Sequence, residues 1–217
     1  MIMKDVIFKY ERPGIAVDVV LFAIINNDLK VGLIKREDEP YHGKHALPGR
    51  FVRYDEKIED TAKKALEIKG NIDQSDILLE QLYTFGQDLE RDTRIRTISI
   101  VYFALVDFEK IKRQEGNKLL FESVHRLPPM GFDHKSIINF ALERLRNDIW
   151  TSDFAAALMP KEFTLTELQR AYEIILNQNL DKRNFRKKIL EMNILKKISR
   201  TKREGPHRPA QIYSFKS

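Results

Sequence analysis

The distribution of apolar residues in the first half of the chain predicts a β-sheet. Residues 14–25 form a continuous, β-branched apolar run, which is typical of a strand with both faces buried. A short polar turn at 26–28 separates this run from a second one at 29–35, so we expect a β-hairpin. Residues 78–85 and 96–108 have the same strand-like composition. The chain therefore begins with a sheet of at least four strands.

Two stretches with helical spacing are predicted to flank this sheet. Neither Pro nor Gly interrupts residues 56–69, whose apolar positions on one helical face are Ile58, Ala62, Ala65 and Leu66. Gly70 follows, at the position where a helix end favours a left-handed residue. The second helix is expected after Asp133, its predicted N-cap, with an apolar face formed by Ile137, Ile138, Ala141, Leu142 and Leu145. This order of elements predicts an α/β fold with a mixed sheet flanked by helices.

The pattern changes in the last quarter of the chain. Thr164 and Glu167 have the spacing of a capping box, and Asp181 is expected to cap a second helix. The apolar face of this second helix consists of Phe185, Ile189 and Met192. Two strand-like runs, 194–198 and 210–215, then enclose a basic tip. Two helices followed by a hairpin with a basic tip are typical of a winged helix-turn-helix domain.

The charge distribution divides the chain at the same place. Residues 160–217 contain 14 Lys and Arg against 6 Asp and Glu, whereas residues 1–159 contain 24 against 26. The formal net charge of the whole chain is +6, so its positive excess lies in the last quarter. We therefore expect an N-terminal domain at 1–149, a connection at 150–160 and a basic winged-helix domain at 161–217.

A basic helix followed by a basic hairpin tip indicates duplex DNA as a partner. A helix fits the major groove, where polar side chains reach base edges while Lys and Arg neutralise phosphates. The candidate DNA-binding residues are Lys182, Arg183, Asn184, Arg186 and Lys187 on the helix, and Lys202, Arg203, His207 and Arg208 at the tip. Two alternatives stay open, an ordinary solvated basic surface and a module that binds RNA or another protein.

The loop and helix at 47–72 resemble the Nudix box, G-x5-E-x7-R-E-U-x-E-E-x-G-U, in which U is an apolar residue. We align Gly49 and Gly70 with the first and last Gly of this pattern, which places Asp55 at the first Glu. The positions that support the loop and helix are retained in this alignment. The resemblance therefore implies a Nudix fold, an α/β/α sandwich that in enzymes holds a divalent metal over a diphosphate.

Under this alignment, two of the three helix carboxylates that usually bind the metal are replaced. Lys64 brings an ammonium where a ligand oxygen is required, Ile68 brings an apolar group, and Glu67 is the residual acidic position. We therefore expect no catalytic residue, no metal site and no cofactor. The alternative is an ADP-ribose or nucleoside-diphosphate pyrophosphatase that uses Mg²⁺ or Mn²⁺ at a displaced site.

The resemblance extends over nearly all of the chain to Nudix-related bacterial transcriptional regulators. It rests on the segment 163–195 and on a run that contains Leu127, Pro128, Phe132, Asp133 and His134. One group of these regulators, the NrtR regulators of NAD metabolism, responds to ADP-ribose or a related nucleotide, and another group responds to L-arabinose. The resemblance implies a ligand-responsive transcriptional regulator, a repressor or an activator, that binds operator DNA as a homodimer.

Five arginines are candidates for binding the effector. A guanidinium binds a phosphate through two parallel hydrogen bonds, so a cluster of arginines favours a phosphorylated ligand over a sugar. The candidates are Arg36, Arg50, Arg91, Arg94 and Arg96. Ordinary surface arginines are the alternative interpretation.

The composition also suggests where the protein acts. The chain has no cysteine, which excludes a disulfide framework and cysteine-based metal or nucleophile sites. We find no apolar run near the ~18 residues that a membrane-spanning helix needs, and no secretory signal. We therefore expect a cytoplasmic protein.

Overall fold

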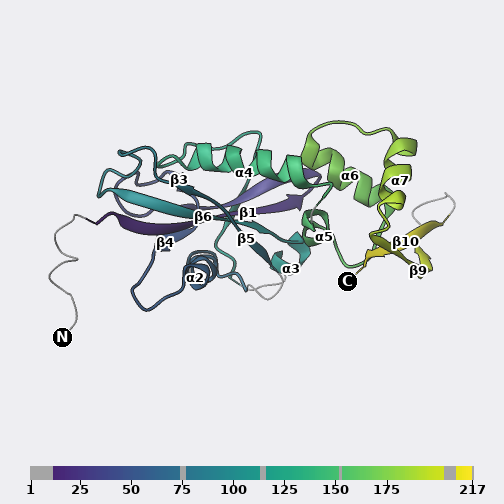
Figure 1. Cartoon of the computed structure of the whole chain (residues 1–217), viewed down its shortest axis with the longest axis horizontal. Coiled ribbons are helices and arrows are strands. Elements are labelled where there is room, and N and C mark those ends of the chain that lie inside the picture. Colours follow the sequence, from purple (N-terminus) through teal and green to yellow (C-terminus); the bar gives the residue numbers. More distant parts are fainter. Residues whose placement is uncertain (1–11, 74–76, 113–115, 152, 203–208, 217) are drawn as a thin grey trace.

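The computed structural model describes residues 12–73, 77–112, 116–151, 153–202 and 209–216. It consists of an α/β sandwich followed by a helical module with a small sheet (Figure 1). The elements of the sandwich are β1 (Gly14–Ile25), β2 (Asp28–Lys35), β3 (His45–Ala46), β4 (Gly49–Phe51), α2 (Ile58–Gly70), β5 (Leu78–Phe85), β6 (Thr97–Leu105), α3 (Phe108–Lys112), β7 (Leu120–Ser123) and α4 (His134–Asp148). Those of the C-terminal module are α5 (Phe154–Leu158), β8 (Phe163–Thr164), α6 (Leu165–Leu176), α7 (Lys182–Glu191), β9 (Leu195–Lys202) and β10 (Ala210–Phe215).

Strand β1 is the centre of the mixed sheet. It runs parallel to β6, and on its other side it pairs antiparallel first with β4 and then with β2. Strands β5 and β7 extend the sheet by antiparallel pairing with β6 and β2. The predicted hairpin between β1 and β2 is confirmed. Its turn residues Asn26 and Asn27 both have positive φ, which matches the twist of a tight hairpin.

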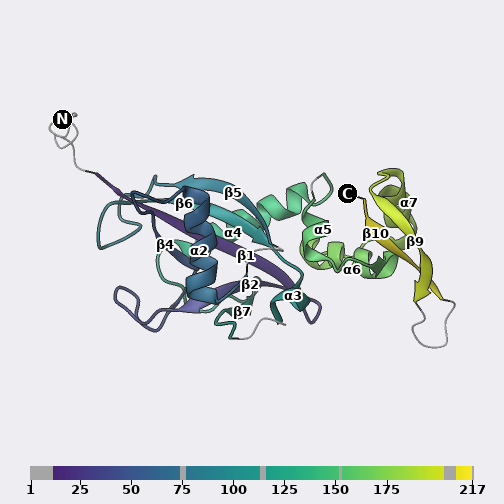
Figure 2. The ribbon, with the colours of Figure 1, turned by 90° about the horizontal axis from the view of Figure 1, so that it is seen from below.

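Helices cover both faces of this sheet. Figure 1 shows α4 along one face and α2 along the other, and Figure 2 shows α2 crossing the strands. Alternate residues of β1 pack toward the two helical layers, because successive side chains of a strand point to opposite faces. Val20 and Phe22 belong to the core that includes α4, whereas Val19 and Leu21 belong to the core under α2. The predicted α/β sandwich with a mixed sheet is therefore confirmed.

The C-terminal module has the predicted winged-helix arrangement. The capping box is complete, since the Thr164 hydroxyl accepts from Glu167 N and the Glu167 carboxylate accepts from Thr164 N. The Asp181 carboxylate caps α7 by accepting from Asn184 N. Strands β8, β10 and β9 form a separate antiparallel sheet in that order. β9 extends to Lys202, beyond the 194–198 predicted for it.

The two modules share one hydrophobic core. The Phe154 ring on α5 lies 5.0 Å from the Phe103 ring on β6, centroid to centroid. Just after α4, Trp150 lies 4.5 Å from Tyr172 on α6 and 6.0 Å from Phe185 on α7. The segment predicted as a connection, 150–160, therefore contributes apolar side chains to this shared core.

Helix α2 differs from its prediction at both ends. Ile58 is 38% exposed, and Thr61 is buried with the predicted Ala62, Ala65 and Leu66. Gly70 is the last helical residue, and the left-handed residue is Asn71, with φ of 52°. A Cβ at Gly70 would meet Leu119 at 2.9 Å, so close packing explains this glycine.

The short helix α3, after β6, was not predicted, because five residues are too few for a helical period to stand out. Across the described residues, no helix combines the length and the apolar character required to cross a membrane.

Candidate effector pocket and DNA-binding surface

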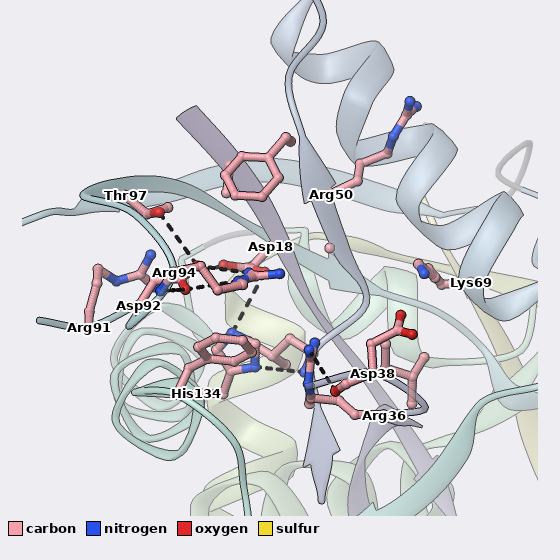
Figure 3. A pocket seen from close by; sticks show the side chains of 17 residues that line it. Asp18, Arg36, Asp38, Arg50, Lys69, Arg91, Asp92, Arg94, Thr97 and His134 are labelled. Atoms are coloured by element: carbon pink, nitrogen blue, oxygen red, sulfur yellow. Dashed lines mark hydrogen bonds and ion pairs between the residues drawn. The ribbon is translucent and has the colours of Figure 1, made fainter. Parts of the chain in front are cut away.

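A cavity of about 180 Å³ opens beside the first half of β1. Strand β4, the end of α2, the loop before β6 and the start of α4 contribute to its walls (Figure 3). It is lined by five cationic side chains and three carboxylates, namely Arg36, Arg50, Lys69, Arg91 and Arg94, and Asp18, Asp38 and Asp92. Aromatic walls are supplied by Phe51 and Phe132. Charged groups and flat apolar surfaces therefore face the same space.

Asp18 and His134 form the buried polar floor of the cavity. The Asp18 carboxylate accepts a 2.5 Å hydrogen bond from the Ser99 hydroxyl. His134 Nδ1 accepts from Leu47 N at 2.9 Å, so the ring proton lies on Nε2, 3.7 Å from Asp18 Oδ1. Burial lowers the pKa of His134, against the opposing effect of Asp18, and the ring is neutral near neutral pH.

Gly49 lets β4 pass directly over this floor. A Cβ at Gly49 would lie 2.1 Å from Asp18 Oδ1 and 2.8 Å from the Val17 carbonyl oxygen. No side chain fits in that space, so glycine is required for the contact.

Arg91 stabilises the wall of the pocket through a buried ion pair. Its side chain is 4% exposed and donates two hydrogen bonds, of 2.9 and 2.8 Å, to the Asp133 carboxylate. Asp133 is the first residue before α4, as predicted, but its side chain makes no capping hydrogen bond. Its carboxylate binds Arg91 instead and ties the loop before β6 to the start of α4.

Arg94 presents a guanidinium to the cavity between aromatic rings. It donates two hydrogen bonds to Asp92, and its Cζ lies 5.6 Å from the Phe51 centroid and 5.3 Å from that of Phe132. Burial of Asp92 disfavours its charge, but the hydrogen bonds from Arg94 prevail and lower the pKa of that carboxyl. Arg94 is thus held in place by Asp92, with its guanidinium near both aromatic walls of the cavity.

The other predicted arginines have different roles. Arg36 donates to the carbonyls of Pro40 and Asp38 and lies 4.9 Å from the Phe132 ring, within the cavity wall. Arg50 also lines the cavity but pairs with Glu56 at 3.1 Å. Arg96 does not line it, because its guanidinium donates to backbone carbonyls, including that of Gly86.

Contacts around α2 correct our alignment of the Nudix box by one residue. In the pattern the Arg is the eighth residue after the first Glu, and here Lys64, the eighth residue after Glu56, pairs with it at 2.7 Å. Hydrogen bonds from Lys64 and then Thr61 lower the pKa of Glu56 to about 2. The left-handed Asn71 then occupies the position of the last Gly, and Arg50 that of the first.

This register replaces all three metal-binding carboxylates rather than two. The three positions fall on Ala65, Ile68 and Lys69, of which the first two offer no oxygen ligand and the third repels a cation. Glu67, our residual acidic position, is exposed and does not line the cavity. These residues do not fit a magnesium ion at the usual Nudix position. Within the described residues, no group of three or more His, Cys, Asp or Glu is arranged to hold a metal.

The candidate DNA-binding residues lie mainly on the outer face of α7. Lys182, Arg183, Asn184 and Lys187 are exposed, and Arg186 is half-buried, with Nη2 3.4 Å from the Thr166 hydroxyl. On the wing, Lys202 pairs with Glu167 at 2.6 Å. A groove between α6, α7 and the wing is lined by Lys182, Arg186 and Lys202. Arg203, His207 and Arg208 fall outside the described residues.

Sequence reasoning missed Asp18, Asp92, Lys69 and Thr97 as pocket residues. The signal for Asp18 was present, because it is the one charged residue inside the apolar run 14–25. The other three required the fold, since their neighbours come from distant parts of the chain.

Comparisons with known proteins agree with both modules. Residues 155–215 match the NrtR DNA-binding winged helix domain. The "ADPR responsive transcriptional repressor NtrR" of Acinetobacter baylyi is 34% identical over 213 residues, which cover 95% of this chain and 83% of that protein. An ADP-ribose pyrophosphatase of Methanocaldococcus jannaschii is 32% identical over 130 residues, 59% of this chain and 73% of the enzyme.

Solved structures of such regulators are also similar to this chain. Shewanella oneidensis NrtR complexed with a 27mer DNA has a TM-score of 0.80 at 29% identity and covers 93% of both chains. The Nudix domain of that protein complexed with ADP ribose has a TM-score of 0.56 at 29% identity, and the match covers 67% of this chain and 99% of that domain. The chain therefore belongs to the NrtR family of ligand-responsive, DNA-binding transcriptional regulators, in which a Nudix domain precedes a winged helix.

Proposed function

We propose that this protein is a repressor that binds ADP-ribose in the cavity beside β1 and operator DNA with α7 and the wing. The observation that carries the effector assignment is Arg94, whose guanidinium lies near the rings of Phe51 and Phe132. Such a site suits a ligand that combines a flat base with phosphates, because rings stack and cations bind oxyanions.

The relatives support this choice of effector. The Acinetobacter repressor is named as ADPR responsive, and the Shewanella Nudix domain was crystallised with ADP ribose. A pentose such as L-arabinose carries no negative charge that could interact with the five cationic side chains that line the cavity. ADP-ribose is therefore favoured over the sugar.

For DNA, we propose that α7 enters the major groove. Lys182, Arg183, Asn184 and Lys187 are its exposed polar residues, and Arg186 lines the groove beside it. Lys202, with Arg203, His207 and Arg208, would contact the backbone or the minor groove. The Shewanella relative is a DNA complex, which supports the assignment.

We further propose that the protein acts as a homodimer on inverted half-sites, in the cytoplasm, where bacterial operator DNA lies. The effector domain would correspond to residues 1–149, with 150–160 as the connection and 161–217 as the DNA-binding domain. No cofactor is needed for either binding event.

ADP-ribose hydrolysis is the second candidate, favoured by the similarity to the Methanocaldococcus pyrophosphatase. Against it stand Ala65, Ile68 and Lys69 at the carboxylate positions of the box. Incubation with ADP-ribose and Mg²⁺ should therefore release no AMP. Steady release of AMP would favour the enzyme.

The effector assignment is tested by thermal unfolding with ADP-ribose, NAD, nucleotides and pentoses. A ligand that binds the native state raises its apparent stability, so we expect ADP-ribose to raise the Tm and L-arabinose to leave it unchanged. Phe132→Ala should abolish the shift. Phe140→Ala, a matched change at a 40% exposed ring of α4 outside the cavity lining, should keep it. A shift with the pentose alone would reject the assignment.

A further inference from the structure

We propose that Lys69 binds the diphosphate of the effector and takes the place of the divalent metal that Nudix enzymes use. The inference rests on the proposed function, because it specifies how the same pocket recognises a diphosphate. It adds that effector binding is independent of metal and depends on one ammonium group.

Lys69 lies in the last turn of α2 and lines the cavity. Figure 3 shows its side chain on the α2 side, across the cavity from Asp92 and Arg94. In the corrected register it occupies one of the three metal-binding carboxylate positions. The positive charge that a metal would supply is therefore carried by the protein itself.

Lys69 also differs from the other cations of the cavity. Arg36, Arg50, Arg91 and Arg94 each donate to a carboxylate or a carbonyl of the protein. The Lys69 ammonium makes no hydrogen bond or ion pair within the described part of the chain. It is therefore the cation of this cavity whose donors are available to a ligand.

A second cavity meets the first at Lys69. It is lined by Lys35 and Lys118, and it shares Arg36, Asp38 and Lys69 with the first cavity. A diphosphate diester joins two bulky groups, so its charged centre suits the junction between two compartments. Glu37 and Asp38 disfavour an anion there, but the four lysines and arginines that line the second cavity outweigh its two carboxylates.

Isothermal titration of the full-length protein with ADP-ribose, in EDTA and in MgCl₂, tests the inference. We expect the wild-type protein to bind equally well under both conditions. Lys69→Met, which keeps the length and removes the charge, should weaken binding by at least about tenfold, as expected for a charge-assisted hydrogen bond. Lys69→Arg should restore much of it.

Lys63→Met is the matched control, because Lys63 is on the same helix but pairs with Glu59 and does not line the cavity. Its affinity should equal that of the wild-type protein. Wild-type binding that requires Mg²⁺, or unchanged binding by Lys69→Met, overturns the inference.

Inorganic pyrophosphate separates this inference from the proposed effector. If pyrophosphate binds in a Lys69-dependent way while ADP-ribose does not bind, the diphosphate site stands and the proposed effector is rejected. If neither probe binds, both proposals fail.

Discussion

The effector pocket and the outer face of α7 are both rich in cations, but they hold them differently. In the pocket, Arg91 and Arg94 each bind a carboxylate through two hydrogen bonds. On α7, Lys182 and Arg183 make no hydrogen bond or ion pair with any described residue. Lys187 contacts Glu191 only at 4.0 Å, and both side chains are well exposed.

The difference matches the two proposed ligands. A small molecule binds tightly when its site is already formed, because little ordering is needed on binding. A DNA duplex presents many equivalent phosphates, and solvated side chains can adjust to them and release counterions. Arginines held by carboxylates therefore give the pocket a fixed shape, in which Lys69 is left for the ligand, whereas the solvated cations of α7 suit a long polyanion.

The largest expected effect comes from breaking the pairing in the pocket. Asp133→Ala would leave the buried Arg91 guanidinium without its bidentate partner, and among the described residues Asp18, at 3.9 Å, would be the remaining ion-pair partner. We expect a loss of about 3 kcal/mol in the free energy of unfolding, measured by urea titration.

Asp148→Ala provides the matched control at the other end of α4. Asp148 pairs with Arg144, whose side chain is 50% exposed, so this change should cost less than about 0.5 kcal/mol. Equal losses of stability in both variants would show that the Arg91–Asp133 pair does not stabilise the fold more than an exposed ion pair does.

On α7 we expect a substitution to weaken DNA binding and to leave the stability of the fold unchanged. Arg183→Ala should leave the free energy of unfolding unchanged and weaken binding to a selected operator by about 1–3 kcal/mol if the side chain contacts a base. Fluorescence anisotropy with labelled DNA measures the affinity for the operator, and Arg144→Ala on α4 is the control. Wild-type affinity in Arg183→Ala would remove this residue from the recognition surface.

The smallest effect concerns the pH dependence of stability. The pKa of Glu56 is lowered from its ordinary value of 4.5 to about 2, so its pairing stabilises the fold above pH 4.5. That contribution declines as the pH falls from 4.5 towards 2. Glu56→Gln should flatten the profile of urea midpoints in this window. The exposed Glu67→Gln should keep the wild-type profile, and an identical slope in Glu56→Gln would contradict the assignment.

Local patterns predicted most of the architecture. The strands at 14–25, 78–85 and 210–215 have the predicted bounds, and so does the capping box at Thr164. Each of these features depends on alternation, on a turn or on a cap within a few residues of chain. The NrtR resemblance was confirmed for the same reason, because its motifs are contiguous segments.

The pocket was less predictable, because its contacts join distant residues. Ser99 reaches Asp18 across 81 positions, through the parallel register of β1 and β6. The one-residue error in the box arose from assigning the left-handed position to Gly70, although Asn also adopts this conformation. Placing Asn71 at the last Gly of the pattern fixes the alignment of the box. This alignment puts Lys69 at one of the three metal-binding carboxylate positions.

Helix α4 extends from the effector pocket to the contact with α7. It starts beside the cavity with His134 and, just after it ends, Trp150 contacts Phe185 and Lys188 of α7. Its 15 residues make a rod about 22 Å long, so a tilt of about 5° at the pocket moves the far end by about 2 Å. That displacement is more than half of the ~3.4 Å rise of one base pair. A tilt of this size would therefore be enough to displace the α7 side of the contact by a large part of one base-pair step.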